Sequence, residues 1–166
     1  ANKVISRWAS QCAVSYKDTS LRNTVYTGNP VRQAIIEARR IDSSHIREKL
    51  KVPNENLFIV ATGGSLGARR INLALRDAIP HFDKGIGLTV YHIIGRRDWE
   101  EIARSEGELR KYIDYRPIEF EYDMPSVLRS ADLIISRAGG SITAEIAALG
   151  LPSVLVPLPN APGDHQ

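Results

Sequence analysis

Residues 57–68 read LFIVATGGSLGA, and this stretch decides the fold. A short run of apolar, β-branched and aromatic residues is typical of a strand that is buried on both faces of a sheet. The run ends in glycines, and the residues that follow lie close to the spacing of a helix with one buried face: Ala68, Ile71, Asn72, Leu75 and Ile79. The stretch therefore predicts a strand, a tight turn and a helix, which together form the repeating unit of a parallel α/β sheet.

The same alternation continues through the rest of the chain. Further strands are predicted at residues 88–94, 113–120, 132–136 and 153–158. Helices are predicted at residues 98–104, 124–130 and 141–149, and Gly150 and Pro152 end the last of them. This series predicts a Rossmann-like α/β fold, a parallel sheet with helices on both faces.

The first 33 residues follow a different pattern. They predict a helix at residues 2–11, strands at residues 12–16 and 24–26, and a turn at residues 27–30. We interpret residues 1–33 as the tail of an N-terminal domain with its linker. Residues 34–166 are then expected to form a second domain, truncated at its C-terminus.

Composition narrows the class of protein. Of 166 residues, 43% are hydrophobic and 25% are charged, which is ordinary for a globular protein. The net charge is only +3, and the basic residues are scattered, so no nucleic-acid partner is expected. The lone Cys12 cannot form an internal disulfide, which favours a reducing compartment.

The turn at residues 63–68 is the first candidate site. Gly63, Gly64 and Gly67 allow a ligand to approach the backbone closely, and the start of the following helix favours an anion such as a diphosphate. Ser65 either caps that helix or donates its hydroxyl to a phosphate. The spacing is neither the dinucleotide-binding G-x-G-x-x-G pattern nor a P-loop.

A second glycine turn follows the strand at residues 132–136, in the sequence SRAGGSITAE (residues 136–145). Glu145 is expected in the first turn of the next helix. Its carboxylate can accept hydrogen bonds from a ribose diol. The alternative is that an acidic residue simply suits a helix N-terminus.

The loop after the last strand carries Asp164, His165 and Gln166, which either contact a sugar or form an ordinary surface loop. The four histidines show no metal-ligand spacing, so neither a metal nor another cofactor is expected. No arrangement of Ser, His and Asp indicates a hydrolytic triad.

Taken in order, these motifs resemble the MurG family, the UDP-N-acetylglucosamine–N-acetylmuramyl-(pentapeptide) pyrophosphoryl-undecaprenol N-acetylglucosamine transferases. Each motif is weak alone, but the ordered set covers nearly the whole chain. The motifs are TGNPVR (27–32), GGSLGA (63–68), FEYDM (120–124), ADLIISRAGG (131–140), Glu145 with GLP (150–152), and VPLP (156–159) with DHQ (164–166). The resemblance implies the C-terminal half of a GT-B glycosyltransferase.

The resemblance also implies site residues for UDP-N-acetylglucosamine. Arg32 and Ser65 would lie near the phosphates, the main chain of Glu121 would hold the uracil, and Gln166 would reach the sugar. The donor would be lined by Gly140, Ser141, Ile142, Thr143, Ala144 and Glu145, with Glu145 on the ribose. Three positions depart from the family pattern. The family usually has Gln at the position of Leu66, an apolar residue at that of Glu121 and Thr at that of Ile142.

The implied enzyme is a hexosyltransferase of peptidoglycan synthesis, which transfers N-acetylglucosamine to undecaprenyl-pyrophosphoryl-MurNAc-pentapeptide. It would work in the bacterial cytoplasm, peripheral on the cytoplasmic face of the cell membrane. Its catalytic residues and acceptor site are expected in an N-terminal domain outside this chain, so the chain alone is expected to be inactive. The alternatives are a related GT-B enzyme (a glycolipid glucosyltransferase or an epimerase), a non-catalytic nucleotide-sugar-binding module, and a dehydrogenase domain.

Overall fold

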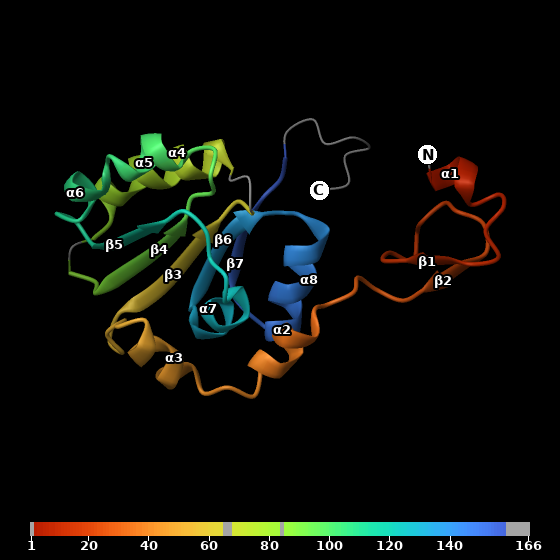
Figure 1. The fold of residues 1–166 in the computed structure, drawn as a ribbon, viewed down its shortest axis with the longest axis horizontal. Coiled ribbons are helices and arrows are strands. Elements are labelled where there is room, and N and C mark those ends of the chain that lie inside the picture. Colours follow the sequence, from red (N-terminus) through yellow and green to blue (C-terminus); the bar gives the residue numbers. More distant parts are fainter. Residues whose placement is uncertain (1, 65–67, 84, 159–166) are drawn as a thin grey trace.

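The core of the molecule is a five-stranded, fully parallel sheet (Figure 1). The computed structural model describes residues 2–64, 68–83 and 85–158. The strand order is β5-β4-β3-β6-β7, so the strand of the opening stretch, β3, is central. The strands are β3 (Leu57–Thr62), β4 (Leu88–Ile93), β5 (Asp114–Ile118), β6 (Leu133–Arg137) and β7 (Ser153–Val156). The predicted α/β class is confirmed.

Helices cover both faces of this sheet, because the side chains of β3 alternate between two apolar clusters. Phe58 and Val60 pack on one face, whereas Ile59 and Ala61 pack on the other. The first face is covered by α2 (Gln33–Ala38), α3 (Ser43–Lys49), α7 (Met124–Ser130) and α8 (Gly140–Leu149). The second is covered by α4 (Arg69–Ala78), η1 (Ile79–His81), α5 (Trp99–Ala103) and α6 (Glu106–Leu109).

Local chemistry sets the helix ends. The carboxylate of Asp42 accepts a hydrogen bond from the Ser44 N–H at 3.0 Å and caps the start of α3. At the other end of the chain, Gly150 takes a left-handed conformation (φ 67°) and ends α8 as predicted. The short helices α2, α3 and α6 were not predicted, because stretches of 6, 7 and 4 residues are too short for a helical period to be recognised.

A buried arginine joins the amino ends of the two central strands. Arg47 on α3 donates to the Ser130 carbonyl at 3.1 Å and to the Asp132 carboxylate at 2.5 Å. Asp132 also accepts the Phe58 N–H at 2.8 Å, where β3 begins. This arrangement fixes the edge of the sheet that lies opposite the carboxyl ends of the strands.

The N-terminal segment is set apart from the sheet and reaches it through an extended stretch, residues 27–32 (Figure 1). It contains α1 (Asn2–Ile5) and a parallel pair of strands, β1 (Cys12–Val14) and β2 (Thr24–Tyr26). The predicted helix at residues 2–11 was too long, since the helical hydrogen bonding gives way to turns after Ile5. Large apolar side chains of this segment are exposed, Trp8 by 78%.

Candidate functional site

A cleft of about 520 Å³ opens where β3 and β6 end. Ligands of doubly wound sheets bind at this carboxyl edge. Four parts of the chain come together here: the two glycine turns, the linker before α2 and the start of α7. The lining residues are Pro30, Arg32, Thr62, Gly63, Gly64, Met124, Ser136, Arg137, Gly139, Gly140, Ser141, Ile142 and Glu145.

The first turn needs glycine at Gly64 for its backbone conformation. Gly64 has φ 83°, and a Cβ built on it would meet no atom within 4 Å, so conformation and not space selects glycine. The Gly64 N–H donates to the Thr62 hydroxyl at 3.3 Å. Gly63 and Gly64 therefore place bare backbone against the cleft. Ser65 and Gly67 lie outside the described residues.

The second turn needs glycine for close approach. A Cβ on Gly140 would lie 3.2 Å from Asn29 Nδ2, because the Asn29 amide donates to the Gly140 carbonyl at 3.0 Å. Asn29 in turn accepts the Ser15 hydroxyl at 2.6 Å. A chain of hydrogen bonds thus connects Ser15, the residue after β1, to the linker and the first turn of α8.

Arg32 and Glu145 form a two-pronged ion pair in the cleft. Arg32 Nε donates to Glu145 Oε1 at 2.6 Å, and Arg32 Nη2 donates to Glu145 Oε2 at 2.9 Å. The Glu145 side chain is only 7% exposed, whereas that of Arg32 is 56% exposed. The hydrogen bond to Glu145 raises the pKa of Arg32. The pair presents a fixed carboxylate and a guanidinium with N–H groups to spare.

The placement of Glu145 in the first helical turn was wrong. Helix α8 begins at Gly140, and a turn takes about 3.6 residues, so Glu145 lies in the second turn. Its charge therefore meets Arg32 and not the free N–H groups at the helix start. The alternative, in which Glu145 simply stabilises the N-terminus of the helix, is therefore wrong.

The other predicted residues of α8 divide into two sets. Gly140, Ser141 and Ile142 line the cleft beside Glu145. Thr143 and Ala144 are not among the lining residues, and the Thr143 hydroxyl donates to the Gly139 carbonyl at 2.9 Å. The hydroxyl of Thr143 therefore does not replace the hydroxyl that the family usually has at Ile142.

Glu121, a predicted site residue, is not among the residues that line the cleft. Its carboxylate accepts hydrogen bonds from the Tyr91 hydroxyl and the Asp123 N–H, each at 2.7 Å, and it borders a separate cavity of about 160 Å³. Burial, more than the bond to Glu121, raises the pKa of Tyr91. The neighbouring Met124, where α7 begins, does line the cleft. Gln166 lies outside the described residues.

Several lining residues were not predicted, and they are those directly beside the motifs. Thr62, Ser136 and Arg137 end the two central strands, and any residue at that position of a parallel sheet faces the carboxyl edge. The end of a predicted buried strand is therefore the sequence signal that could have identified these three residues. Within residues 2–64, 68–83 and 85–158, no group of three His, Cys, Asp or Glu side chains is arranged to hold a metal ion. The helices of the same residues include none long and apolar enough to cross a membrane.

A doubly wound parallel sheet with a cleft between two glycine turns at its carboxyl edge defines a Rossmann-like α/β domain. Residues 58–166 match the glycosyltransferase family 28 C-terminal domain. The chain belongs to this glycosyltransferase family.

Relatives and solved structures agree with this assignment. The chain is 40% identical over 86% of its length to a UDP-N-acetylglucosamine–N-acetylmuramyl-(pentapeptide) pyrophosphoryl-undecaprenol N-acetylglucosamine transferase of Moorella thermoacetica, of which it covers 38%. It is 31% identical to the protein of that name from Acetivibrio thermocellus, over 99% of this chain and 45% of the relative. The chain thus spans less than half the length of these relatives.

The structural neighbours support the same fold. The crystal structure of Acinetobacter baumannii MurG matches 99% of this chain and 44% of its own, with a TM-score of 0.72 and 27% identity. A UDP-GlcNAc 2-epimerase from Neisseria meningitidis matches 80% of this chain and 37% of its own, with a TM-score of 0.54 and 18% identity, which shows the fold alone. The predicted C-terminal half of a GT-B glycosyltransferase and the resemblance to MurG are confirmed.

Proposed function

We propose that this chain is the donor-binding part of a transferase of peptidoglycan synthesis that moves N-acetylglucosamine from UDP to a lipid-linked muramyl pentapeptide. The names of the relatives support the reaction. The observation that carries the proposal is the Arg32–Glu145 pair at the mouth of a cleft between two glycine turns. The guanidinium of Arg32 can donate to the phosphates of a nucleoside diphosphate, and the carboxylate of Glu145 can accept from its ribose hydroxyls.

The diphosphate is assigned to the helix start and Arg32. The first N–H groups of a helix have no intrahelical acceptor, and Gly140, Ser141 and Ile142 carry those groups at the start of α8. A guanidinium has five N–H donors, and Glu145 takes two of those of Arg32. The remaining donors suit phosphate oxygens, and no metal ion is required to offset the charge.

The ribose is assigned to Glu145. Each of its two oxygens accepts one hydrogen bond from Arg32 and keeps acceptor capacity for another. Two vicinal hydroxyls can donate to this fixed carboxylate. The uracil is assigned to the main chain at Glu121, which forms no hydrogen bond with other described residues. Ser65 and Gln166 complete the proposed set, at the phosphates and the sugar.

Titration of this chain with UDP-N-acetylglucosamine, UDP-glucose and NAD by calorimetry tests the proposal. We expect binding of both UDP-sugars, tighter for the N-acetylated one, and none of NAD. Glu145→Ala should weaken UDP binding about tenfold, the loss of one or two hydrogen bonds. Arg76→Ala is the control, because Arg76 lies in the last turn of α4, pairs with Asp77 and does not line the cleft; it should leave affinity unchanged. Binding of NAD alone would overturn the proposal, and unchanged affinity in Glu145→Ala would remove Glu145 from the site.

We also propose that residues 1–33 are the tail and linker of an N-terminal domain that carries the acceptor site and the catalytic residues. Large apolar side chains of this segment are 57–78% exposed, namely those of Ile5, Trp8, Tyr16 and Tyr26. Apolar side chains that are exposed together often mark a surface that another domain covers. The whole enzyme would then act at the cytoplasmic face of the bacterial membrane, where its lipid-linked acceptor lies. We expect this chain alone to bind donor without transfer; measurable transfer to the lipid-linked acceptor would contradict this division.

A further inference from the structure

A side-chain amide of the linker bonds directly to the wall of the cleft. Asn29 Nδ2 lies 3.0 Å from the carbonyl oxygen of Gly140, and Asn29 Oδ1 lies 2.6 Å from the Ser15 hydroxyl. Gly140 is the first residue of α8, and it lines the cleft together with Pro30, the neighbour of Asn29. The Asn29 amide therefore connects the N-terminal segment to the cleft through two hydrogen bonds.

The partners of Asn29 fix the direction of both bonds. The Gly140 carbonyl can only accept, so the NH₂ group of Asn29 must face it. The Asn29 oxygen then faces Ser15, whose hydroxyl must donate. Hydrogen bonds that follow one another in the same direction polarise each other, by about 10–30% per bond. The amide that bonds to Gly140 is thus a stronger donor than it would be without Ser15.

The polarisation continues into the peptide group after Gly140. The carbonyl of Gly140 and the N–H of Ser141 belong to one planar, conjugated amide, so a hydrogen bond to the oxygen also strengthens the N–H as a donor. The Ser141 N–H lies in the first turn of α8 and has no acceptor inside the helix. It has no other main-chain acceptor among the residues that the structure describes. Ser141 itself lines the cleft.

Asn29 also holds this peptide group in place from outside the helix. Inside the helix, the Gly139 carbonyl accepts the Thr143 N–H at 3.0 Å. Outside it, the Asn29 side chain lies so close that a Cβ on Gly140 would be 3.2 Å from Asn29 Nδ2. The first turn of α8 is therefore fixed by its own hydrogen bonding and by Asn29.

We propose that Asn29 is a positioning residue for the diphosphate of the donor: it holds and polarises the Gly140–Ser141 peptide, whose N–H donates to a phosphate oxygen. The inference rests on the function proposed above and adds to it a residue that does not touch the donor. It explains why the position carries an amide, which accepts at one atom and donates at another. An Asp side chain would have no hydrogen for the Gly140 carbonyl, and an Ala side chain would leave Ser15 and Gly140 without this partner.

The test compares UDP with uridine, because a weaker N–H donor at the start of α8 affects the phosphates and not the base or the ribose. We expect Asn29→Ala to weaken UDP binding about three- to tenfold by calorimetry, the loss of one hydrogen bond. Uridine affinity, followed by NMR, should stay nearly the same, because the bonds between Arg32 and Glu145 remain. Gln33→Ala is the matched control. It removes a nearby amide that donates to Glu37 within α2 and does not line the cleft, so the ratio of UDP to uridine affinity should not change.

The amide nitrogen resonance of Ser141 provides a second measurement, made without ligand. Loss of the hydrogen bond to the Gly140 carbonyl should shift this resonance in Asn29→Ala and leave it in place in Gln33→Ala. An unchanged Ser141 resonance in Asn29→Ala would show that the peptide is not polarised and would overturn the inference.

Circular dichroism establishes that each variant is folded, and Asn29→Ser provides a milder change if Asn29→Ala does not fold. An equal loss of UDP and uridine binding, or unchanged UDP binding, in a folded Asn29 variant would overturn the inference alone. If the unmodified chain binds neither UDP nor uridine, the proposed function is wrong and the inference falls with it.

Discussion

Arg32 and Glu145 lie 113 positions apart in the sequence, yet two hydrogen bonds of 2.6 and 2.9 Å join them in the cleft. The pair links the segment before α2 to the second turn of α8. Glu145 is the buried member of the pair, so its ionised carboxylate is stabilised by an arginine that is itself mostly exposed. This asymmetry gives the first prediction.

Arg32→Ala should lower the free energy of unfolding by about 1–2 kcal/mol, since it leaves a buried carboxylate without its cation. The value is modest because solvent screens the exposed guanidinium. Urea unfolding measures it. In the Glu145→Gln background, where the side chain is neutral, the same Arg32 change should cost less than half as much. Equal costs in the two backgrounds would show that the pair is not coupled.

Gly64→Ala should destabilise the protein by about 1–2 kcal/mol, because alanine resists a φ of 83°. Gly150→Ala at φ 67° imposes the same strain at the far end of α8 and serves as the control. Thermal unfolding should show similar losses for both variants. Only Gly64→Ala should weaken UDP binding several-fold. A matching loss of affinity in Gly150→Ala would assign the effect to general instability.

Gly140→Ala should be destabilising only while Asn29 is present. The new methyl group would lie 3.2 Å from Asn29 Nδ2 and displace the amide from its hydrogen bonds. In an Asn29→Ala background the same change should become neutral or stabilising, because alanine favours a helix over glycine by about 1 kcal/mol. A double-mutant cycle by urea unfolding measures this coupling. Gly139→Ala, whose Cβ would meet only Ile142 at 3.8 Å, should show no coupling to Asn29.

Acid should destabilise the protein through His92. Burial lowers the folded-state pKa of His92 to about 4, below the usual 6.5, so the unfolded chain binds a proton that the folded chain does not. The resulting stability is complete above pH 6.5 and falls as the pH drops toward 4, by about 2–3 kcal/mol at pH 4.5. His92→Gln should flatten this part of the curve in urea unfolding at pH 7 and 4.5. An unchanged slope would show that His92 is not the group that titrates.

The sequence predicted the strands and long helices well, because burial on both faces leaves a local signal. The continuous apolar run of β3 and the spacing of Ile71, Leu75 and Ile79 on α4 can be read without any distant contact. Helix α6 escaped prediction because its only buried residue is Leu109. A single buried apolar residue cannot form the repeating pattern by which a helix is recognised in a sequence.

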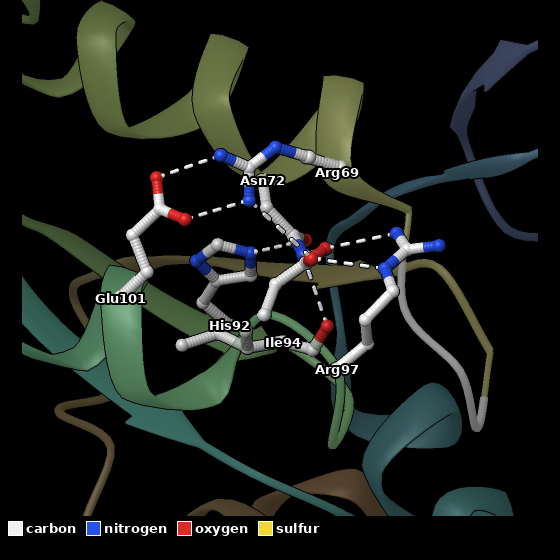
Figure 2. Close-up of polar contacts among 7 residues, drawn as sticks. Arg69, Asn72, His92, Ile94, Arg97 and Glu101 are labelled. Carbon is white, nitrogen blue, oxygen red and sulfur yellow. Dashed lines mark hydrogen bonds and ion pairs between the residues drawn. The ribbon is translucent and has the colours of Figure 1, made fainter.

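The sequence indicated the glycine turns that line the candidate cleft, but not the pairs of side chains within it. Glycines after a buried strand indicate Gly64 and Gly140 from local sequence alone. Arg32 came only from the family resemblance, and its bond to Glu145 is a long-range contact that no local pattern contains. The sequence placed Asn72 on the buried face of α4, and its burial confirms this. The hydrogen bonds of its side chain to Ile94 and Asp98 (Figure 2) were not predicted, because they too are long-range contacts.

The linker is fastened to α8 at two points, Gly140 through Asn29 and Glu145 through Arg32. Two attachments more than a turn apart on one helix fix both the place and the direction of a short segment, so residues 29–32 must travel with α8. On the N-terminal side of this anchored stretch lies Gly28, whose left-handed φ of 74° turns the chain toward β2. The Ser15–Asn29 hydrogen bond spans this turn, so the linker is also joined to the N-terminal segment.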